Sequence, residues 1–225
     1  AVAPAFSFPL TLAIREKGKS VVMQEGPSIK TSLRGEQAKT LLFLLLLEFL
    51  FGFGFGLVSP MIPIYLTERF GSTATEIGAF SMIGFGLTAF LAQIPSAKLA
   101  GRLGMGRLIF YSCLVIPLAF FLWGSRTEYV ELLVLYMVST AAWSMTWPCT
   151  ASILMEATPS SWRGLFSGLS LTSIMLGFTM GPAVAGTLWQ DLSHQAPFYA
   201  ASLVFGVSVP TALLLERSRR TVKAR

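Results

Sequence analysis

Long apolar segments separated by short polar connections make up most of the sequence. The hydrophobic pattern predicts six such segments, at residues 40–66, 76–100, 106–124, 130–156, 164–190 and 197–216. An α-helix rises about 1.5 Å per residue, so about 20 apolar residues cross the roughly 30 Å hydrocarbon core of a bilayer. We therefore expect an all-α integral membrane protein, a six-transmembrane-helix bundle joined by short connections.

The first of these segments differs from the others in carrying one carboxylate in an otherwise apolar run. Glu48 is its only side chain that is charged at pH 7, and an ionised group inside a membrane is costly. Gly52 and Gly56 follow four residues apart, a spacing that lets two helices approach closely. We expect the remaining helices to pack around this segment.

The regions that flank the six segments have different compositions. Residues 1–14 are apolar but too short to span a membrane alone, so we interpret them as the tail of a preceding transmembrane helix. Residues 15–39 are polar and basic and predict a cytoplasmic linker, and residues 217–225 predict a cytoplasmic basic tail after the bundle at 40–216. The chain begins at Ala1 rather than at a methionine, which leaves two interpretations open: a fragment whose beginning is missing, or a chain that pairs with a separate one.

Composition and charge support a membrane location. The chain is 53% hydrophobic and 12% charged, whereas a soluble domain carries about 25% charged residues. Its net charge of +6 could indicate a nucleic-acid partner, but fifteen of its seventeen basic residues fall in segments on one side of the predicted bundle. Arg69 and Arg126 are the two exceptions. Because basic loops stay in the cytoplasm, we expect a multi-pass cell-membrane protein with both termini cytoplasmic and no nucleic-acid partner.

Residues typical of catalysis or metal binding are scarce. Cys113 and Cys149 both lie inside apolar segments, and their spacing indicates neither a disulfide framework nor a metal site. The only histidine, His194, lies in a polar connection. The sequence contains no His-Glu-x-x-His motif and no paired carboxylates within a segment, so we expect no metal, no cofactor and no enzymatic activity.

A basic, glycine-containing turn joins the second and third segments. It reads Ala-Lys-Leu-Ala-Gly-Arg-Leu-Gly-Met-Gly-Arg and includes Lys98, Arg102, Gly104 and Arg107. Glycine permits a tight turn there, and the basic residues favour the cytoplasmic surface. The string resembles the loop motif of the major facilitator superfamily, Gly-x-x-x-Asp-Arg-x-Gly-Arg-Lys. It departs from that motif at Gly101, where the family's first half has Asp.

A second motif lies in the fifth segment and contains Gly177, Gly181, Pro182 and Gly186. Small residues at this spacing predict a close helix contact, and proline predicts a bend. The string is similar to the Gly-x-x-x-Gly-Pro-x-x-Gly-Gly signature of exporters in the same family. That signature belongs to the first half of those proteins, so an ordinary glycine-rich packing face remains an equal interpretation.

Further strings extend the resemblance over residues 40–216. They are Pro60-x-x-Pro63-x-Tyr-Leu and the turn at residues 156–164, Glu-Ala-Thr-Pro-Ser-Ser-Trp-Arg-Gly. Full members of the family consist of two six-helix halves. The resemblance therefore implies one half of a permease, and the missing Asp in the loop favours the C-terminal half. Its partner would be an N-terminal six-helix half, upstream in the same chain or in a separate chain.

Candidate site residues were chosen from the few polar and aromatic side chains within the segments. For substrate or proton handling we select Glu48, Gln93, Trp143 and Trp147, with core packing as the alternative for each. For a gating network at the cytoplasmic surface, we select a group of charged residues and one glycine: Lys98, Arg102, Gly104, Arg107, Glu156 and Arg163.

The function implied by the resemblance is secondary transport of a small solute by alternating access, with proton-coupled export as one form. Sparse charge inside the segments favours a hydrophobic, amphiphilic or neutral solute. The alternative is a non-transporting membrane scaffold or partner subunit. A polar cavity at the face of the bundle would favour transport over the scaffold.

Overall fold

The computed structural model describes residues 35–223. The predictions for residues 1–14, and for the linker before residue 35, lie outside the described residues. In chain order the elements are α3 (Gly35–Val58), α4 (Met61–Phe70), α5 (Ala74–Ser81), the π-helix η1 (Met82–Leu87), α6 (Thr88–Leu103), α7 (Met105–Ser125), α8 (Tyr129–Ala157), the short 3₁₀ helix η2 (Ser160–Trp162), α9 (Arg163–Asp191) and α10 (Ala196–Lys223).

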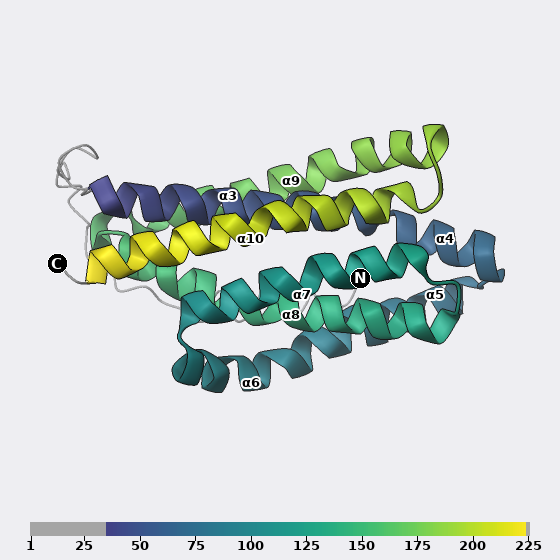
Figure 1. Cartoon of the computed structure of the whole chain (residues 1–225), viewed down its shortest axis with the longest axis horizontal. Helices are drawn as coiled ribbons and strands as arrows, with labels where there is room; N and C mark the ends of the chain where they lie inside the picture. The colour runs from purple at the N-terminus through teal and green to yellow at the C-terminus, as the bar shows by residue number, and fades with distance from the viewer. Residues whose placement is uncertain (1–34, 224–225) are drawn as a thin grey trace, which may run out of the picture. The chain divides into compact units, whose positions relative to one another are not determined.

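These elements form six helical spans within the described residues, each long and apolar enough to cross a membrane. The first span combines α3 and α4, and the second combines α5, η1 and α6. The spans lie alongside one another, and α3 begins at the same end of the bundle at which α10 finishes (Figure 1). The predicted all-α, six-span membrane bundle is confirmed.

Local sequence explains where the spans break and turn. The first span breaks between α3 and α4, next to Pro60. Proline lacks the backbone N–H that a continuous helix requires, which explains the break. Gly71 ends α4 in the left-handed region at φ 65°, and its N–H donates to the Thr67 carbonyl at 2.9 Å. Thr73 then starts α5 through a capping box with Glu76. Together they reverse the chain within a few residues.

The α6–α7 turn also depends on glycine. Gly104 has φ 89°, a conformation that side-chain-bearing residues rarely adopt, while Gly101 lies within α6. Of the glycines in the predicted turn, Gly104 is therefore the one at which the chain reverses direction.

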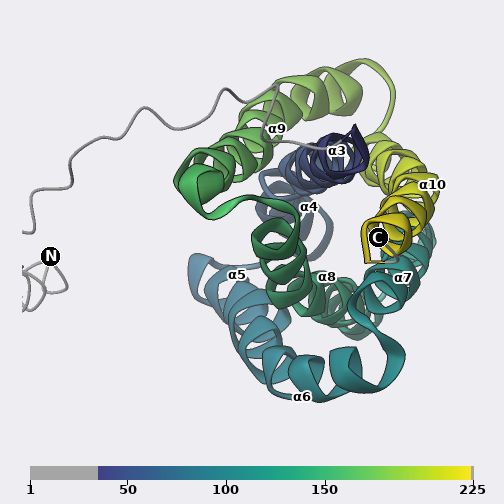
Figure 2. The same cartoon turned by 90° about the vertical axis from the view of Figure 1, so that its left-hand side faces the viewer.

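Helix α3 packs between α9 and α10. It contacts α9 most extensively, then α10, while α7 packs against α8 and α10, and α6 packs against α8. Figure 2, which looks along the helices, shows α9 and α10 on either side of α3 and the α5–α6 span on the far side of α8. Buried aromatic rings fill the centre, with Phe55 contacting both Phe120 and Phe205 edge-on at centroid distances of 5.8 and 5.2 Å.

The last helix extends further than the sequence pattern suggested. Helix α10 continues to Lys223, through the residues assigned to a basic tail. Arg219 lies in this extension and makes a 3.0 Å ion pair with Glu156 of α8. This ion pair helps to stabilise the part of α10 that lies beyond the apolar segment, because it joins that part to α8.

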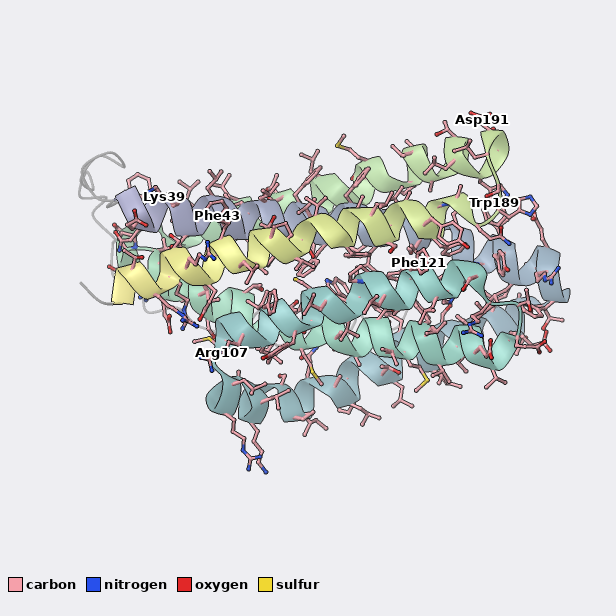
Figure 3. The ribbon with its side chains drawn as sticks, viewed as in Figure 1. Lys39, Phe43, Arg107, Phe121, Trp189 and Asp191 are labelled. Atoms are coloured by element: carbon pink, nitrogen blue, oxygen red, sulfur yellow. The ribbon has the colours of Figure 1, made fainter. Side chains whose placement is uncertain are left out.

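The two ends of the bundle differ in charge. Lys39 of α3 and Arg107 of α7 lie at one end, and Trp189 and Asp191 of α9 lie at the other (Figure 3). We call the first the basic end; the α6–α7 and α8–α9 connections and the end of α10 lie there (Figure 1). At the opposite end the described residues contain two arginines, Arg69 and Arg126.

Candidate functional site

The first functional candidate is a cavity of about 560 Å³ that Glu48 helps to line. Helices α3, α8 and α9 and the π-helix η1 border it. We call it the carboxylate cavity, and its lining is apolar and aromatic apart from Glu48 and three hydroxyl residues: Glu48, Phe85, Trp143, Trp147, Thr150, Ala151, Leu154, Met155, Ser167, Ser170, Leu171, Ile174, Met175 and Phe178.

Glu48 is the one charged residue in this lining. Its position, thirteen residues after Gly35, places it about 20 Å along α3 from the basic end. The residue is 8% exposed and makes no ion pair within the described part of the chain. Its polar neighbour is the Thr150 hydroxyl of α8, which also donates to the Trp147 carbonyl at 3.1 Å. The cavity thus presents one carboxyl group against an apolar wall.

Trp143 and Trp147 lie next to each other on this wall. Their rings meet edge to face at 4.8 Å, and Trp143 also contacts the rings of Phe55 at 4.2 Å and Phe85 at 5.8 Å. Trp143 is 2% exposed, and its indole Nε1 has no hydrogen-bond partner among the described residues. A buried unpaired donor costs about 1–3 kcal/mol, so this residue of the cavity wall carries an unsatisfied polar atom in the folded protein.

The fourth residue selected for substrate or proton handling lies elsewhere. Gln93 is an exposed residue of α6 and is not part of the cavity lining. Its backbone carbonyl accepts a hydrogen bond from Ser96 at 2.7 Å. The structure therefore brings Glu48, Trp143 and Trp147 together and leaves Gln93 apart.

Other lining residues had no clear signal in the sequence. Phe85 and Phe178 resemble many other phenylalanines, and hydroxyl residues are common in membrane helices. Ser167 and Ser170 are three apart, a spacing that places them on one helix face. That periodicity is the one signal that could have pointed to them.

The predicted glycine contact is formed by the backbones of α3 and α9. A Cβ added at Gly181 would lie 2.5 Å from the Gly56 carbonyl carbon, and one added at Gly52 would collide with the Ile174 carbonyl. Gly177 likewise lies against the backbone of α3. Gly186 has open space around it, and Pro182 is exposed within an uninterrupted α9. The contact positions α9, and hence one wall of the cavity, against α3.

At the basic end, only one residue of the proposed gating group makes an ion pair. Glu156 pairs with Arg219, whose Nη1 lies 3.9 Å from the Glu216 carboxylate. Glu216 in turn fills the space beside Gly106 of α7. Lys98, Arg102, Arg107 and Arg163 make no ion pair within residues 35–223.

These features define a class of protein: a multi-pass helical membrane protein with six spans, in which α3, α8, α9 and η1 border a cavity with a single carboxylate. The family model of the Major Facilitator Superfamily matches residues 44–225, nearly the whole bundle. The chain belongs to the major facilitator superfamily, as the loop and glycine motifs predicted.

Individual relatives are more distant. The chain is 26% identical over 153 residues to the Quinolone resistance protein NorA of Staphylococcus aureus, a match that covers 68% of this chain and 39% of NorA. It is 25% identical over 146 residues to the Uncharacterized MFS-type transporter MJ1560 of Methanocaldococcus jannaschii, covering 65% of this chain and 37% of that protein. The match therefore spans about two fifths of these relatives.

Proposed function

We propose that this chain is the C-terminal half of a permease that moves a small hydrophobic or amphiphilic solute by alternating access. The observation that carries the proposal is the carboxylate cavity, where a buried Glu48 and the unpaired Trp143 N–H share an aromatic wall. Two six-helix bundles rocking about a shared midplane site would expose this cavity to each side in turn. An N-terminal half, upstream or in a separate chain, would supply the facing wall.

Family membership supports transport over the scaffold alternative, and so does the cavity. A scaffold has no need for an intramembrane carboxylate without an ion-pair partner, since such a group is costly. A solute with a large apolar surface fits the wall of rings and methionines, and its polar group could reach Glu48 or Trp143. The NorA name, which refers to quinolone resistance, is consistent with export of an amphiphilic compound. Transport also accounts for the sparse charge in the spans better than catalysis does.

Glu48 is proposed to handle the coupling proton or the polar end of the solute. Thr150 lines the same cavity, and its hydroxyl donates to the Trp147 carbonyl, so its oxygen keeps the capacity to accept a hydrogen bond from a protonated Glu48. When the carboxyl loses its proton, a cationic group of the solute could take the place of that bond. This exchange would couple solute binding to proton release.

The test uses Glu48→Gln in the full-length protein reconstituted into liposomes. Glutamine keeps the size and hydrogen bonding of the side chain but cannot titrate. Uptake of a fluorescent amphiphilic dye driven by a pH gradient should be abolished, while dye counterflow exchange should persist. Glu131→Gln is the matched control, because Glu131 lies outside the cavity in a half-exposed 3.8 Å pair with Arg126. Unchanged gradient-driven uptake in the Glu48→Gln protein would show that Glu48 is structural.

A further inference from the structure

A second, smaller cavity adjoins the carboxylate cavity. It measures about 240 Å³ and lies further toward the opposite end of the bundle, where the early part of α8 and the α3–α4 break border it. We call it the hydroxyl cavity, and its lining residues are Phe55, Ser59, Ile62, Pro63, Ser81, Phe85, Tyr136 and Phe178. Phe85 and Phe178 line both cavities, so these two side chains form the boundary between them.

The hydroxyl cavity offers hydrogen-bonding groups without charge. Tyr136 is 8% exposed, and its hydroxyl makes no hydrogen bond to any described residue. Neither do the side-chain hydroxyls of Ser59 and Ser81 within the same part of the chain. Ser59 is exposed and Ser81 is half-buried, so these hydroxyls, together with that of Tyr136, can bind water or a neutral polar group of a solute. The two cavities therefore differ in chemistry: the carboxylate cavity carries a carboxyl group besides its hydroxyls, whereas the hydroxyl cavity carries hydroxyls without a charged group.

Phe85 is held by an unusual backbone. It lies within the π-helix η1, and the Thr88 hydroxyl donates to the Ile83 carbonyl at 2.7 Å, five residues back. Turns of this kind occur frequently at functional sites. On one side of Phe85, Gly84 packs against the Tyr136 ring, where an added Cβ would lie 2.5 Å from Cδ1; on the other, Gly86 has open space. Because Gly86 has no neighbour within 4 Å, the backbone that follows Phe85 can change its conformation at little steric cost.

Phe178 is held differently. It follows Gly177, whose Cα lies against the α3 backbone, where an added Cβ would be 2.5 Å from the Phe49 carbonyl oxygen. The backbones of α3 and α9 are thus in direct contact beside Phe178, which leaves little freedom for its Cα to shift. One side of the boundary is rigid, and the other lies on an adaptable turn.

We propose that Phe85 and Phe178 form a constriction in the solute path of this half, and that Phe85 determines which solutes pass between the carboxylate and hydroxyl cavities. This proposal rests on the proposed transport function and adds a specificity-determining residue to it. The solutes admitted would be amphiphiles with a neutral hydrogen-bonding group, such as a hydroxyl, ether or carbonyl, that reaches Ser59, Ser81 or Tyr136. Movement of η1 would open the constriction.

The experiment measures access between the two cavities directly, in the full-length protein. Ser170→Cys reports on the carboxylate cavity and Ser59→Cys on the hydroxyl cavity; the native Cys113 and Cys149 are buried and set the background. A small, charged methanethiosulfonate reagent is added on the side from which Ser170→Cys is modified. Its reaction with Ser59→Cys from that side should accelerate about tenfold in a Phe85→Ala background, as when roughly 1.4 kcal/mol is removed from a barrier.

Controls separate the constriction from general loosening. Phe90→Ala, on the same span and 67% exposed, should leave the Ser59→Cys rate unchanged. Phe85→Leu, which keeps an apolar side chain, should give an intermediate rate and covers the case in which Phe85→Ala does not fold. If Ser59→Cys reacts at the same rate in proteins with the native Phe85, with Phe85→Leu and with Phe85→Ala, the proposed constriction is wrong. This readout needs no flux, so a wild-type protein that transports none of the test dyes would contradict the proposed function and not the constriction.

Discussion

The indole N–H of Trp143 is a buried hydrogen-bond donor without a partner among the described residues. Replacing Trp143 with phenylalanine removes this donor and tests its role. In Trp143→Phe the aromatic contacts to Phe55 and Phe85 are largely kept, while the indole N–H is lost. Since a buried unpaired donor costs about 1–3 kcal/mol, thermal stability should stay equal or rise. If the N–H binds solute, the KM for transport should increase about tenfold, the change for one hydrogen bond of roughly 1.4 kcal/mol.

Trp123→Phe is the matched control for that experiment. The Trp123 Nε1 donates to the Leu132 carbonyl at 3.0 Å, so its loss should lower stability by about 0.5–1.5 kcal/mol and leave the KM unchanged. Thermal unfolding in detergent and dye uptake measure the two quantities. A stability loss in Trp143→Phe as large as in Trp123→Phe would mean that the Trp143 N–H has a partner in the folded protein.

At the level of single residues, part of the lining of the carboxylate cavity could be predicted from the sequence. Glu48 stood out because a lone carboxylate in an apolar run is costly, and Trp143 and Trp147 because indoles inside a segment need partners. Gln93 was selected for polarity alone and lies outside the lining. It follows η1, and a π-helical turn changes the phase of every later side chain, which no periodicity in the sequence reveals.

Among helix pairs, the contact between α3 and α9 tolerates the least change. In Gly181→Leu the added side chain would meet the Gly56 backbone, with its Cβ 2.5 Å from a carbonyl carbon. Overpacking of a well-packed core typically costs about 1–3 kcal/mol, and here the added side chain would meet backbone atoms, which cannot move aside as side chains do. We therefore expect a large loss of monodisperse, folded protein, measured by size-exclusion chromatography.

Gly186→Leu provides the comparison on the same helix. Gly186 has nothing within 4 Å of an added Cβ, so this variant should purify like the wild type. Equal yields of both variants would show that α3 and α9 are not in backbone contact. The glycine spacing allowed the contact to be anticipated, but not which of the glycines take part, because that depends on the rotation of both helices.

A second test between helices concerns the ion pairs that join α8 and α10. The Arg219 side chain is 12% exposed and contacts Glu156 and Glu216, whose side chain is 18% exposed. Arg219→Ala would leave Glu216 partly buried with only the exposed Arg220 as partner. Removing one member of a desolvated pair costs more than the roughly 0–1 kcal/mol of an exposed pair. Thermal unfolding should show a decrease clearly larger than that of Arg126→Ala, whose pair with Glu131 is half exposed at 3.8 Å.

Helix α10 continues beyond the last apolar segment, as far as Lys223. Hydropathy marks where apolar residues stop, and it assigned residues 217–225 to a tail. The extension of α10 contains Arg219, which pairs with Glu156 on another span. The two residues are 63 positions apart in the sequence, so no local pattern predicts this contact. The six spans themselves were predictable, since their lengths are set by the bilayer.

For the bundle as a whole, the distribution of charge determines how it is inserted. Several basic residues at the basic end make no ion pair within residues 35–223, among them Lys98, Arg102, Arg107 and Arg163, whereas the opposite end has Arg69 and Arg126. Because short loops rich in Lys and Arg remain in the cytoplasm, the basic end should be cytoplasmic. This would place the carboxylate cavity nearer the cytoplasm and the hydroxyl cavity nearer the outer surface.

Cysteine labelling at the two ends tests this orientation. Ser193, in the α9–α10 connection, and Ser160, in the α8–α9 connection, are both exposed, and the native cysteines are buried. A membrane-impermeant maleimide should label Ser193→Cys in intact cells, whereas Ser160→Cys should react only after the membrane is permeabilised. The reverse pattern would invert the bundle and, with it, the direction in which solute meets Glu48 before Phe85. Labelling at both sites in intact cells would contradict a single orientation, and with it the six-span topology on which alternating access depends.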